Sequence, residues 1–254
     1  MFNTITTQTN SLCNLCESYF PTNEAEGIQV FFPDRGKLRS RKVVTRSRAR
    51  KTGKIPSWKM GRMLQWESKN ERLVFRILDG DATVTALFEQ PLTVCYEDEG
   101  VTHEHFPDVL VEFYDGIEVW EIKDTLDSDR TDIKKRTELL IPRFAQLGIR
   151  YRLVFVDKKN QKGTEAYSLS VRRFGRLPIS PVDRECARRI FRNQNTVSWQ
   201  QIKTGSLGKR GPNIVARLLL EGELATTNQT HALSSETRIF ASTNKQPLVA
   251  EWRN

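Results

Sequence analysis

Asp108, Glu121 and Lys123 are spaced so that they can meet across two neighbouring strands. Because side chains alternate along a strand, Glu121 and Lys123 share one face of the apolar segment that contains them. The dipeptide Asp115-Gly116 suits a tight turn, since those residues supply the positive φ angles of a hairpin. We therefore expect Asp108 to lie beside Glu121 on adjacent antiparallel strands.

Two adjacent carboxylates in a partly dry site repel each other unless a cation lies between them. Hard oxygen ligands favour Mg²⁺, and Mn²⁺ substitutes for it. Such an ion can activate a water molecule and stabilise the charge that develops on a phosphodiester under attack. Lys123 would bind the scissile phosphate or orient the water as a compact point charge. The alternative is that all these residues are ordinary solvated strand charges.

The elements that position these residues can be predicted from the apolar pattern. We expect a helix over about residues 63–78, strands over 83–96, 102–113 and 117–123, a helix over 128–147 with Ser128 as its cap, and a strand over 150–156. The first strand is interrupted at Gln90-Pro91. Glu71 lies on the first helix, beside the apolar residues that face the sheet. The order α-β-β-β-α-β predicts an α/β fold with a mixed sheet flanked by helices.

Four stretches of this region resemble a known family: Glu67–Arg72, Phe88–Pro91, Phe106–Asp108 and Glu121–Lys123. Together they resemble the PD-(D/E)xK nucleases, and within them the TnsA endonuclease subunits of heteromeric transposases, over about residues 62–157. The resemblance implies a restriction-endonuclease-like fold. It also implies catalytic roles for Glu71, Asp108, Glu121 and Lys123, with the three carboxylates as ligands of Mg²⁺.

The resemblance further implies a reaction and partners. The reaction would be hydrolysis at the 5′ ends of transposon DNA, and the partners would be double-stranded DNA, a transposase subunit that cuts the 3′ ends and an ATP-dependent regulator of transposition. Two alternatives stay open. One is a stand-alone restriction or repair nuclease of the same fold, and the other is a catalytically silent DNA-binding scaffold.

The basic residues are concentrated in one N-terminal segment. The chain carries a formal charge of +9, and residues 35–66 contain 12 Lys and Arg but no Asp or Glu. A segment of this composition is not expected to pack into a core, and it can bind the phosphate backbone without reading sequence. A tail that aids solubility or docks a subunit is the alternative. The expected DNA-binding residues are Arg39, Arg41, Lys42, Arg46, Arg48, Arg50, Lys51 and Lys54.

Three regions are expected along the chain: residues 1–61 with the basic arm, residues 62–164 as the nuclease core, and residues 165–254 as a small C-terminal domain. After a hydrophilic stretch over 158–165, Pro178–Pro181 marks a boundary. Short helices follow, with Ser198 and Pro212 at helix starts and Gly222 at a helix end, and then a turn-rich wing. We predict a winged-helix-like domain that binds either DNA or protein.

Other candidate chemistry is weaker. Cys13 and Cys16 have zinc-like spacing but no second pair, so an exposed dithiol is the default. His105 is a candidate auxiliary residue near the metal, or a partner of a neighbouring strand. We find no signal peptide, membrane span or phosphate-binding loop, which predicts a cytoplasmic protein that is not itself an ATPase. The resemblance implies that the protein is bacterial and DNA-associated.

Overall fold

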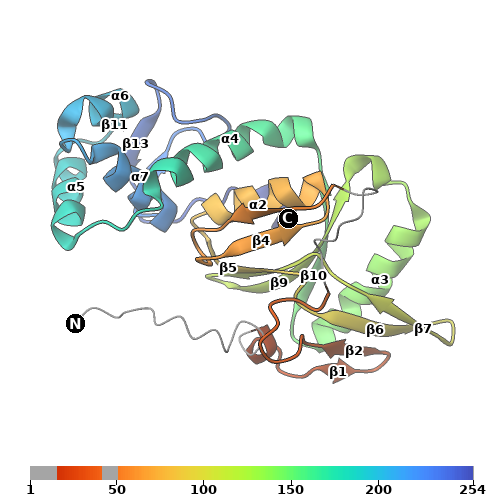
Figure 1. Ribbon diagram of the computed structural model, residues 1–254. Coiled ribbons are helices and arrows are strands. Elements are labelled where there is room, and N and C mark those ends of the chain that lie inside the picture. The colour runs from red at the N-terminus through yellow and green to blue at the C-terminus, as the bar shows by residue number, and fades with distance from the viewer. Residues whose placement is uncertain (1–15, 42–50, 254) are drawn as a thin grey trace. The chain divides into compact units, whose positions relative to one another are not determined.

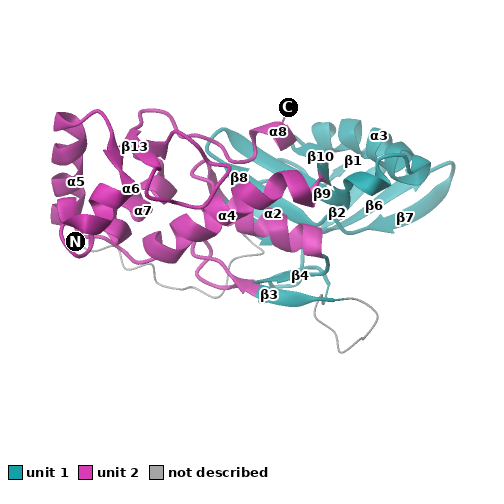
Figure 2. Cartoon of the chain, turned by 90° about the horizontal axis from the view of Figure 1, so that it is seen from above, with its two compact units in different colours: residues 1–54, 64–68, 86–155 teal, residues 55–63, 69–85, 156–254 magenta. Residues whose placement is uncertain are grey.

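The computed structural model describes residues 16–41 and 51–253, and it shows an α/β protein with several sheets. The chain forms two compact units, coloured separately in Figure 2. The first contains residues 1–54, 64–68 and 86–155, and the second contains residues 55–63, 69–85 and 156–254. These units do not follow single cuts near residues 61 and 164, because helix α2 (Lys69–Gly80) packs against α4 (Lys158–Gly175) and groups with the C-terminal part of the chain.

The first unit is built on two sheets, visible in Figure 1. The first sheet is antiparallel, in the order β1 (Glu24–Ala25), β2 (Ile28–Phe31), β6 (Thr93–Asp98) and β7 (Val101–His105). The second has the order β10 (Arg150–Val156), β9 (Gly116–Asp124), β8 (Val109–Phe113) and β5 (Val84–Glu89). The strands expected over 83–96 and 150–156 correspond to β5 with β6 and to β10.

The prediction of one continuous strand over residues 102–113 is wrong. Its two halves are β7 and β8, which belong to different sheets and are separated by Phe106–Asp108. Pro107 has no backbone N–H to donate, so the ladder cannot run through it. This break matters for the site, because it places Asp108 immediately before β8 rather than within a long strand.

The helix expected over residues 63–78 is also wrong in its first part. Met63–Trp66 forms strand β4, which pairs with β3 (Gly53–Pro56), and α2 begins only at Lys69. Trp66 packs directly on Gly53, where an added Cβ would lie 2.5 Å from the indole ring. The apolar positions of β4 span too few residues to distinguish a helix from a strand. The contact with the neighbouring strand β3 favours the strand.

Helix α3 (Thr131–Gln146) follows the short 3₁₀ turn η1 (Thr125–Asp127) and lies along the first unit's sheet (Figure 1). It begins after Arg130 rather than at Ser128, so the expected cap is wrong. Gly148, with φ +76°, follows its end in the left-handed conformation that favours glycine. Phe144 contacts Tyr151 of β10 with ring centroids 4.9 Å apart. This apolar contact anchors the helix to the sheet.

The second unit consists of helices with one small sheet. After α2 and α4 come α5 (Pro181–Asn193), β11 (Val197–Ser198), α6 (Trp199–Gln201), the π-helical turn η2 (Ile202–Ser206), α7 (Gly211–Glu221), β12 (Leu224–Thr226), β13 (Arg238–Ala241) and α8 (Ala250–Arg253). The three strands pair antiparallel in the order β11-β13-β12. The hydrophilic stretch expected over 158–165 is instead the start of α4, because the Asp157 side chain caps it by accepting from the Lys159 N–H at 2.8 Å.

Several predicted helix signals in this unit are confirmed. Ser198 forms a capping box with Gln201, and Gly222 ends α7 in the left-handed conformation with φ 78°. The helices approach closely at glycines. An added Cβ at Gly80 would lie 2.1 Å from the Ser168 hydroxyl, and one at Gly175 would lie 2.6 Å from the backbone of Ala216. Glycine therefore sets the spacing of α4 from α2 and α7.

Within residues 16–41 and 51–253, none of the helices is both long and apolar enough to cross a lipid bilayer.

Candidate active site

The β8–β9 hairpin brings Asp108 and Glu121 together. Its register pairs Val109 with Trp120, and the Asp108 N–H continues the ladder by donating to the Trp120 carbonyl at 3.1 Å. Extending this register by one residue places Asp108 opposite Glu121. Asp108 Oδ2 also accepts from the Ile122 N–H at 2.7 Å, which fixes the orientation of the carboxylate. Both side chains belong to buried residues, with relative exposures of 8% for Asp108 and 2% for Glu121.

Glu121 is surrounded by basic side chains. Its Oε1 forms ion pairs with Lys123 Nζ and with Arg136 Nη2, the latter at 3.0 Å, and its Oε2 lies 3.1 Å from His105 Nε2. Burial raises the pKa of Glu121, but the hydrogen bond and charge of His105 and the charge of Lys123 outweigh burial and lower it to about 2. Glu121 is therefore ionised at neutral pH, although it is almost completely buried.

Lys123 lies under the influence of both carboxylates. Burial lowers the pKa of Lys123, but the charges of Glu121 and then Asp108 raise it above its usual value. The lysine is thus a fixed positive charge beside two negative ones. Tyr151 borders the same group, with its hydroxyl 3.2 Å from His105 Nε2. Burial, followed by the charge of Glu121, raises the pKa of Tyr151, so its phenol stays neutral.

The Gln90-Pro91 interruption supports Asp108 from the side. The Gln90 N–H donates to the Asp108 carbonyl at 3.0 Å, while the Gln90 carbonyl accepts from Ser40 N–H at 2.9 Å. Gln90 has φ 48°, a conformation that is uncommon for residues other than glycine. Its side-chain oxygen also accepts from Arg41 Nε at 2.8 Å. This turn therefore links the backbone beside Asp108 to the segment that carries Arg41.

Glu71 lies in the first turn of α2 and has a relative exposure of 5%. It belongs to the second unit, whereas the other three predicted catalytic residues belong to the first. Its contribution to the carboxylate site stays a prediction.

Part of the basic segment, residues 35–66, contacts the folded core, although its composition predicted that it would not. Arg39 Nη2 lies 2.9 Å from Glu89 Oε1, with the Arg39 side chain 17% exposed, and Arg41 forms an ion pair with Glu67. The expectation that the whole segment stays outside the core is therefore wrong at Arg39, because a buried carboxylate requires a partner. The expected roles of Arg39 and Arg41 in binding DNA stay predictions.

The other basic candidates divide into two groups. Lys51 and Lys54 are exposed and remain available to a phosphate backbone. Lys42, Arg46, Arg48 and Arg50 lie outside the described residues. Cys13 also lies outside them, while Cys16 is buried with a relative exposure of 3%, so the expectation of an exposed thiol is wrong for Cys16.

Two residues of the site escaped sequence reasoning. Arg136 comes from α3 and Tyr151 from β10, and no local spacing links either one to Glu121. Only the packing of the helix and the neighbouring strand on β9 brings them in. A third acidic residue, Glu118, is fully buried but points to the other face of β9, where Arg152 Nε and Trp120 Nε1 each lie 2.8 Å from its Oε2. We interpret Glu118 as structural.

The donor chemistry of Asp108 and Glu121 fits a hard divalent cation. Two carboxylate oxygen donors at one edge of a sheet are what Mg²⁺ or Mn²⁺ prefers. Over the part of the chain that the structure describes, no group of three or more His, Cys, Asp or Glu side chains is arranged around a common metal position. Asp108 and Glu121 would therefore be the pair within this unit that holds such an ion.

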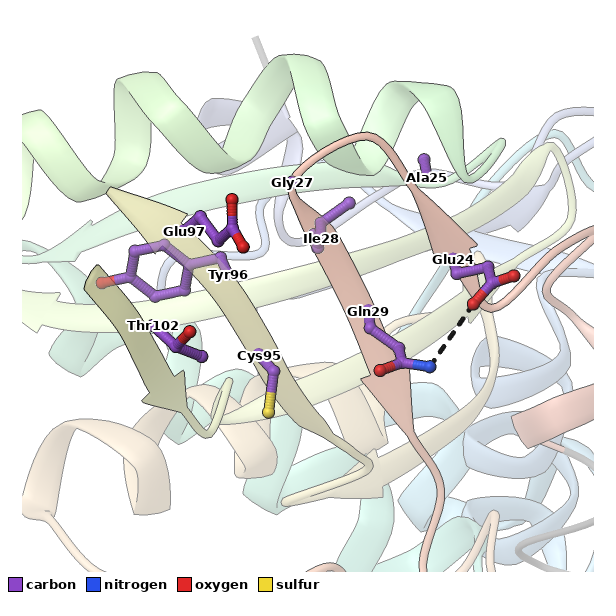
Figure 3. Close-up of a pocket in the computed structure, with 9 residues that line it drawn as sticks. All are labelled: Glu24, Ala25, Gly27, Ile28, Gln29, Cys95, Tyr96, Glu97 and Thr102. Atoms are coloured by element: carbon purple, nitrogen blue, oxygen red, sulfur yellow. Dashed lines mark hydrogen bonds between the residues drawn. The ribbon is translucent and has the colours of Figure 1, made fainter. Parts of the chain in front are cut away.

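A separate pocket of about 570 Å³ lies on the other sheet of the first unit, lined by β1, β2, β6 and β7 (Figure 3). Gln29 Nε2 donates to Glu24 Oε2 at 3.4 Å along one wall. Its candidate nucleophile is Cys95, but burial and then the charge of Glu104 raise the pKa of that thiol. The thiol is therefore not activated, and the carboxylate site remains the stronger candidate.

No protein-family model matches this chain, and a search of curated proteins found no match.

Proposed function

We propose that this protein is a Mg²⁺-dependent DNA endonuclease with a restriction-endonuclease-like fold, acting as the TnsA-like subunit of a heteromeric transposase at the 5′ ends of transposon DNA. The observation that carries the proposal is the pair of buried carboxylates, Asp108 and Glu121, with Lys123 beside them. Burying two like charges side by side is unfavourable, so a site that keeps them needs cations for its function or its stability.

Each residue has a role in this proposal. Asp108 and Glu121 would hold the ion, and a role for Glu71 as a metal ligand follows from the resemblance alone. Lys123 would bind the scissile phosphate or orient the attacking water, and its raised pKa keeps it charged over the working range. When bound, the ion supplies an activated water and stabilises the negative charge that grows on the phosphodiester. The transposase subunit, the ATP-dependent regulator and a bacterial, DNA-associated setting follow from the resemblance alone.

The first test is Mn²⁺ binding by calorimetry, because metal capture needs neither the correct DNA ends nor a partner subunit. Asp108→Asn is the sharpest variant, since an amide oxygen can still accept from the Ile122 N–H while the negative charge is lost. We expect saturable binding to the wild-type protein and a loss of affinity of tenfold or more in the variant, about 1.4 kcal/mol at the least.

Asp132→Asn provides the matched control, because Asp132 is an exposed carboxylate paired with Arg130 at 2.7 Å. Its affinity for Mn²⁺ should equal that of the wild type. Equal affinity of the wild type and Asp108→Asn would contradict the proposed site. No binding to either protein, even with DNA present, would instead favour a catalytically silent scaffold, and cleavage by the isolated chain would favour a stand-alone nuclease.

A further inference from the structure

Arg136 occupies the same oxygen of Glu121 as Lys123 does. The guanidinium reaches Glu121 Oε1 from α3 at 3.0 Å, and the Lys123 ammonium contacts that oxygen from β9 itself. Both cations must leave this oxygen, or share it, before it can coordinate a metal ion. The ion pair with Arg136 therefore competes directly with the proposed metal.

The two carboxylates of this group already have basic partners. Lys123 and Arg136 alone match the charges of Asp108 and Glu121, without counting His105, whose Nε2 lies 3.1 Å from the other oxygen of Glu121. Entry of a divalent cation would leave this group with an excess of at least two positive charges in a partly dry environment, which is strongly unfavourable. An anion that arrives with the metal relieves the excess, and a phosphodiester carries the appropriate charge.

Arg136 is equipped to receive that anion. Its Nε is buried, with no hydrogen-bond acceptor among the described residues, while 24% of the side chain is exposed. A guanidinium offers five N–H donors in a planar fork that matches two phosphate oxygens. The Glu121 contact uses only part of this capacity, so the side chain can turn to a phosphate that enters from solvent.

We infer that Arg136 is a phosphate-binding residue of this site, held on Glu121 until a phosphodiester and a metal ion bind together. The inference rests on the proposed function. It predicts that metal and phosphodiester each strengthen binding of the other, because the coupling of two ligands is reciprocal. Arg136 thereby suppresses metal binding in the absence of DNA, which restricts hydrolysis to the moment when the substrate is in place.

The test compares Mn²⁺ binding to wild type and Arg136→Gln by calorimetry, with and without an excess of dimethyl phosphate as a small phosphodiester. Without the phosphodiester, Arg136→Gln should bind Mn²⁺ about tenfold more tightly, since the competing charge is gone. Dimethyl phosphate should raise the affinity of the wild type for Mn²⁺ and raise that of the variant much less. Metal binding is the readout, so no cleavage assay is needed.

Arg130→Gln is the matched control. Arg130 precedes the same helix, but it is 57% exposed and pairs with Asp132 at 2.7 Å. Its loss should leave both Mn²⁺ affinities unchanged. Thermal unfolding checks that Arg136→Gln is folded, and Arg136→Met, which keeps more of the apolar stem, replaces it if it is not.

The outcomes separate the two proposals. If the wild type binds Mn²⁺ and the Arg136 variant binds it equally or more weakly without phosphodiester, the inference is overturned and the metal site stands. If only the variant binds without phosphodiester, both proposals are supported. If neither protein binds Mn²⁺ under any condition, the proposed metal site fails, and the role of Arg136 fails with it.

Discussion

At the scale of single residues, two buried glutamates of β9 each lie among basic side chains. Glu121 meets Lys123 and Arg136, and Glu118 meets Arg152 on the other face of the same strand. The two glutamates differ in one respect that bears on function. The partners of Glu121 come with a second nearby carboxylate, Asp108, whose charge acts on Lys123. This second carboxylate distinguishes a candidate metal site from a structural ion pair.

A partly buried lysine of the second unit, Lys59, gives a test of the electrostatics that is independent of function. Burial lowers the pKa of Lys59 from 10.5 to about 8, although the charges of Asp79 and Asp81 oppose this change. Because the unfolded chain binds this proton more tightly, the free energy of unfolding should rise with pH from about 8 towards 10.5.

The variant Lys59→Met has no titratable group at this position, so it lacks this pH-dependent contribution to the free energy of unfolding. We expect the difference in unfolding free energy between wild type and variant to change by roughly 2 kcal/mol in favour of the wild type over that pH range. Urea unfolding at several pH values measures it. The exposed Lys54 provides the control, since Lys54→Met should show no such trend. A difference for Lys59→Met that is constant with pH would contradict the lowered pKa.

At the scale of elements, the sequence predicted the hairpin and the C-terminal caps but not the pairing of the N-terminal segments. The β8–β9 hairpin depends on local alternation and on Asp115-Gly116, which are visible in the sequence. The strand β4 depends on its pairing with β3 and on the contact between Trp66 and Gly53. A short apolar segment has no preference strong enough to reveal such a partner.

The same limit applies to the candidate site. Asp108, Glu121 and Lys123 lie within one hairpin, so alternation and turn chemistry suffice to predict that they meet. Arg136 and Tyr151 reach the site through the packing of α3 and β10, which depends on side-chain shape across the sheet. Local patterns carry no information on contacts of this kind. Local patterns therefore identify the candidate catalytic residues but miss the residues from other elements that contact them.

The pairing of Arg39 with Glu89 predicts that Arg39 contributes to stability, whereas exposed lysines of the basic segment do not. Glu89 has a relative exposure of 1%, so Arg39→Met leaves a buried carboxylate without this arginine and should cost roughly 3 kcal/mol of unfolding free energy. Chemical denaturation measures the loss. Lys51→Met, at an exposed position, should change stability by less than about 0.5 kcal/mol. Equal stabilities of the two variants would show that the ion pair has no structural role.

At the scale of the whole molecule, the C-terminal part of the chain has a hydrophobic core of its own. The cluster runs from Tyr167 to Ile239 and includes the fully buried Val197, Ile202 and Val215. All its buried members lie within the region 165–254 that the sequence predicts as a separate domain. Only partly buried side chains such as Trp58 join it from earlier in the chain.

We therefore expect a fragment of residues 165–254 to fold cooperatively, with a lower melting temperature than the same region has in the full chain, because it lacks α2 and the start of α4. Near-ultraviolet circular dichroism is a suitable measurement, since the buried Trp199 packs at 5.4 Å from Phe174 and should give a signal that disappears on heating. A fragment without near-ultraviolet signal at low temperature would show that folding requires segments before residue 165, such as α2 and the start of α4.

The chain passes repeatedly between the two units, and this path has a consequence for biosynthesis. Helix α2 ends at Gly80, whereas its packing partner α4 begins at Lys158, after the last residue of the first unit has been made. On the ribosome, the apolar face of α2, with Leu73 and Ile77, must wait for α4 while the first unit completes its sheets. The nascent chain therefore presents a hydrophobic helix for much of its synthesis, and α2 is the segment that a cotranslational chaperone would bind.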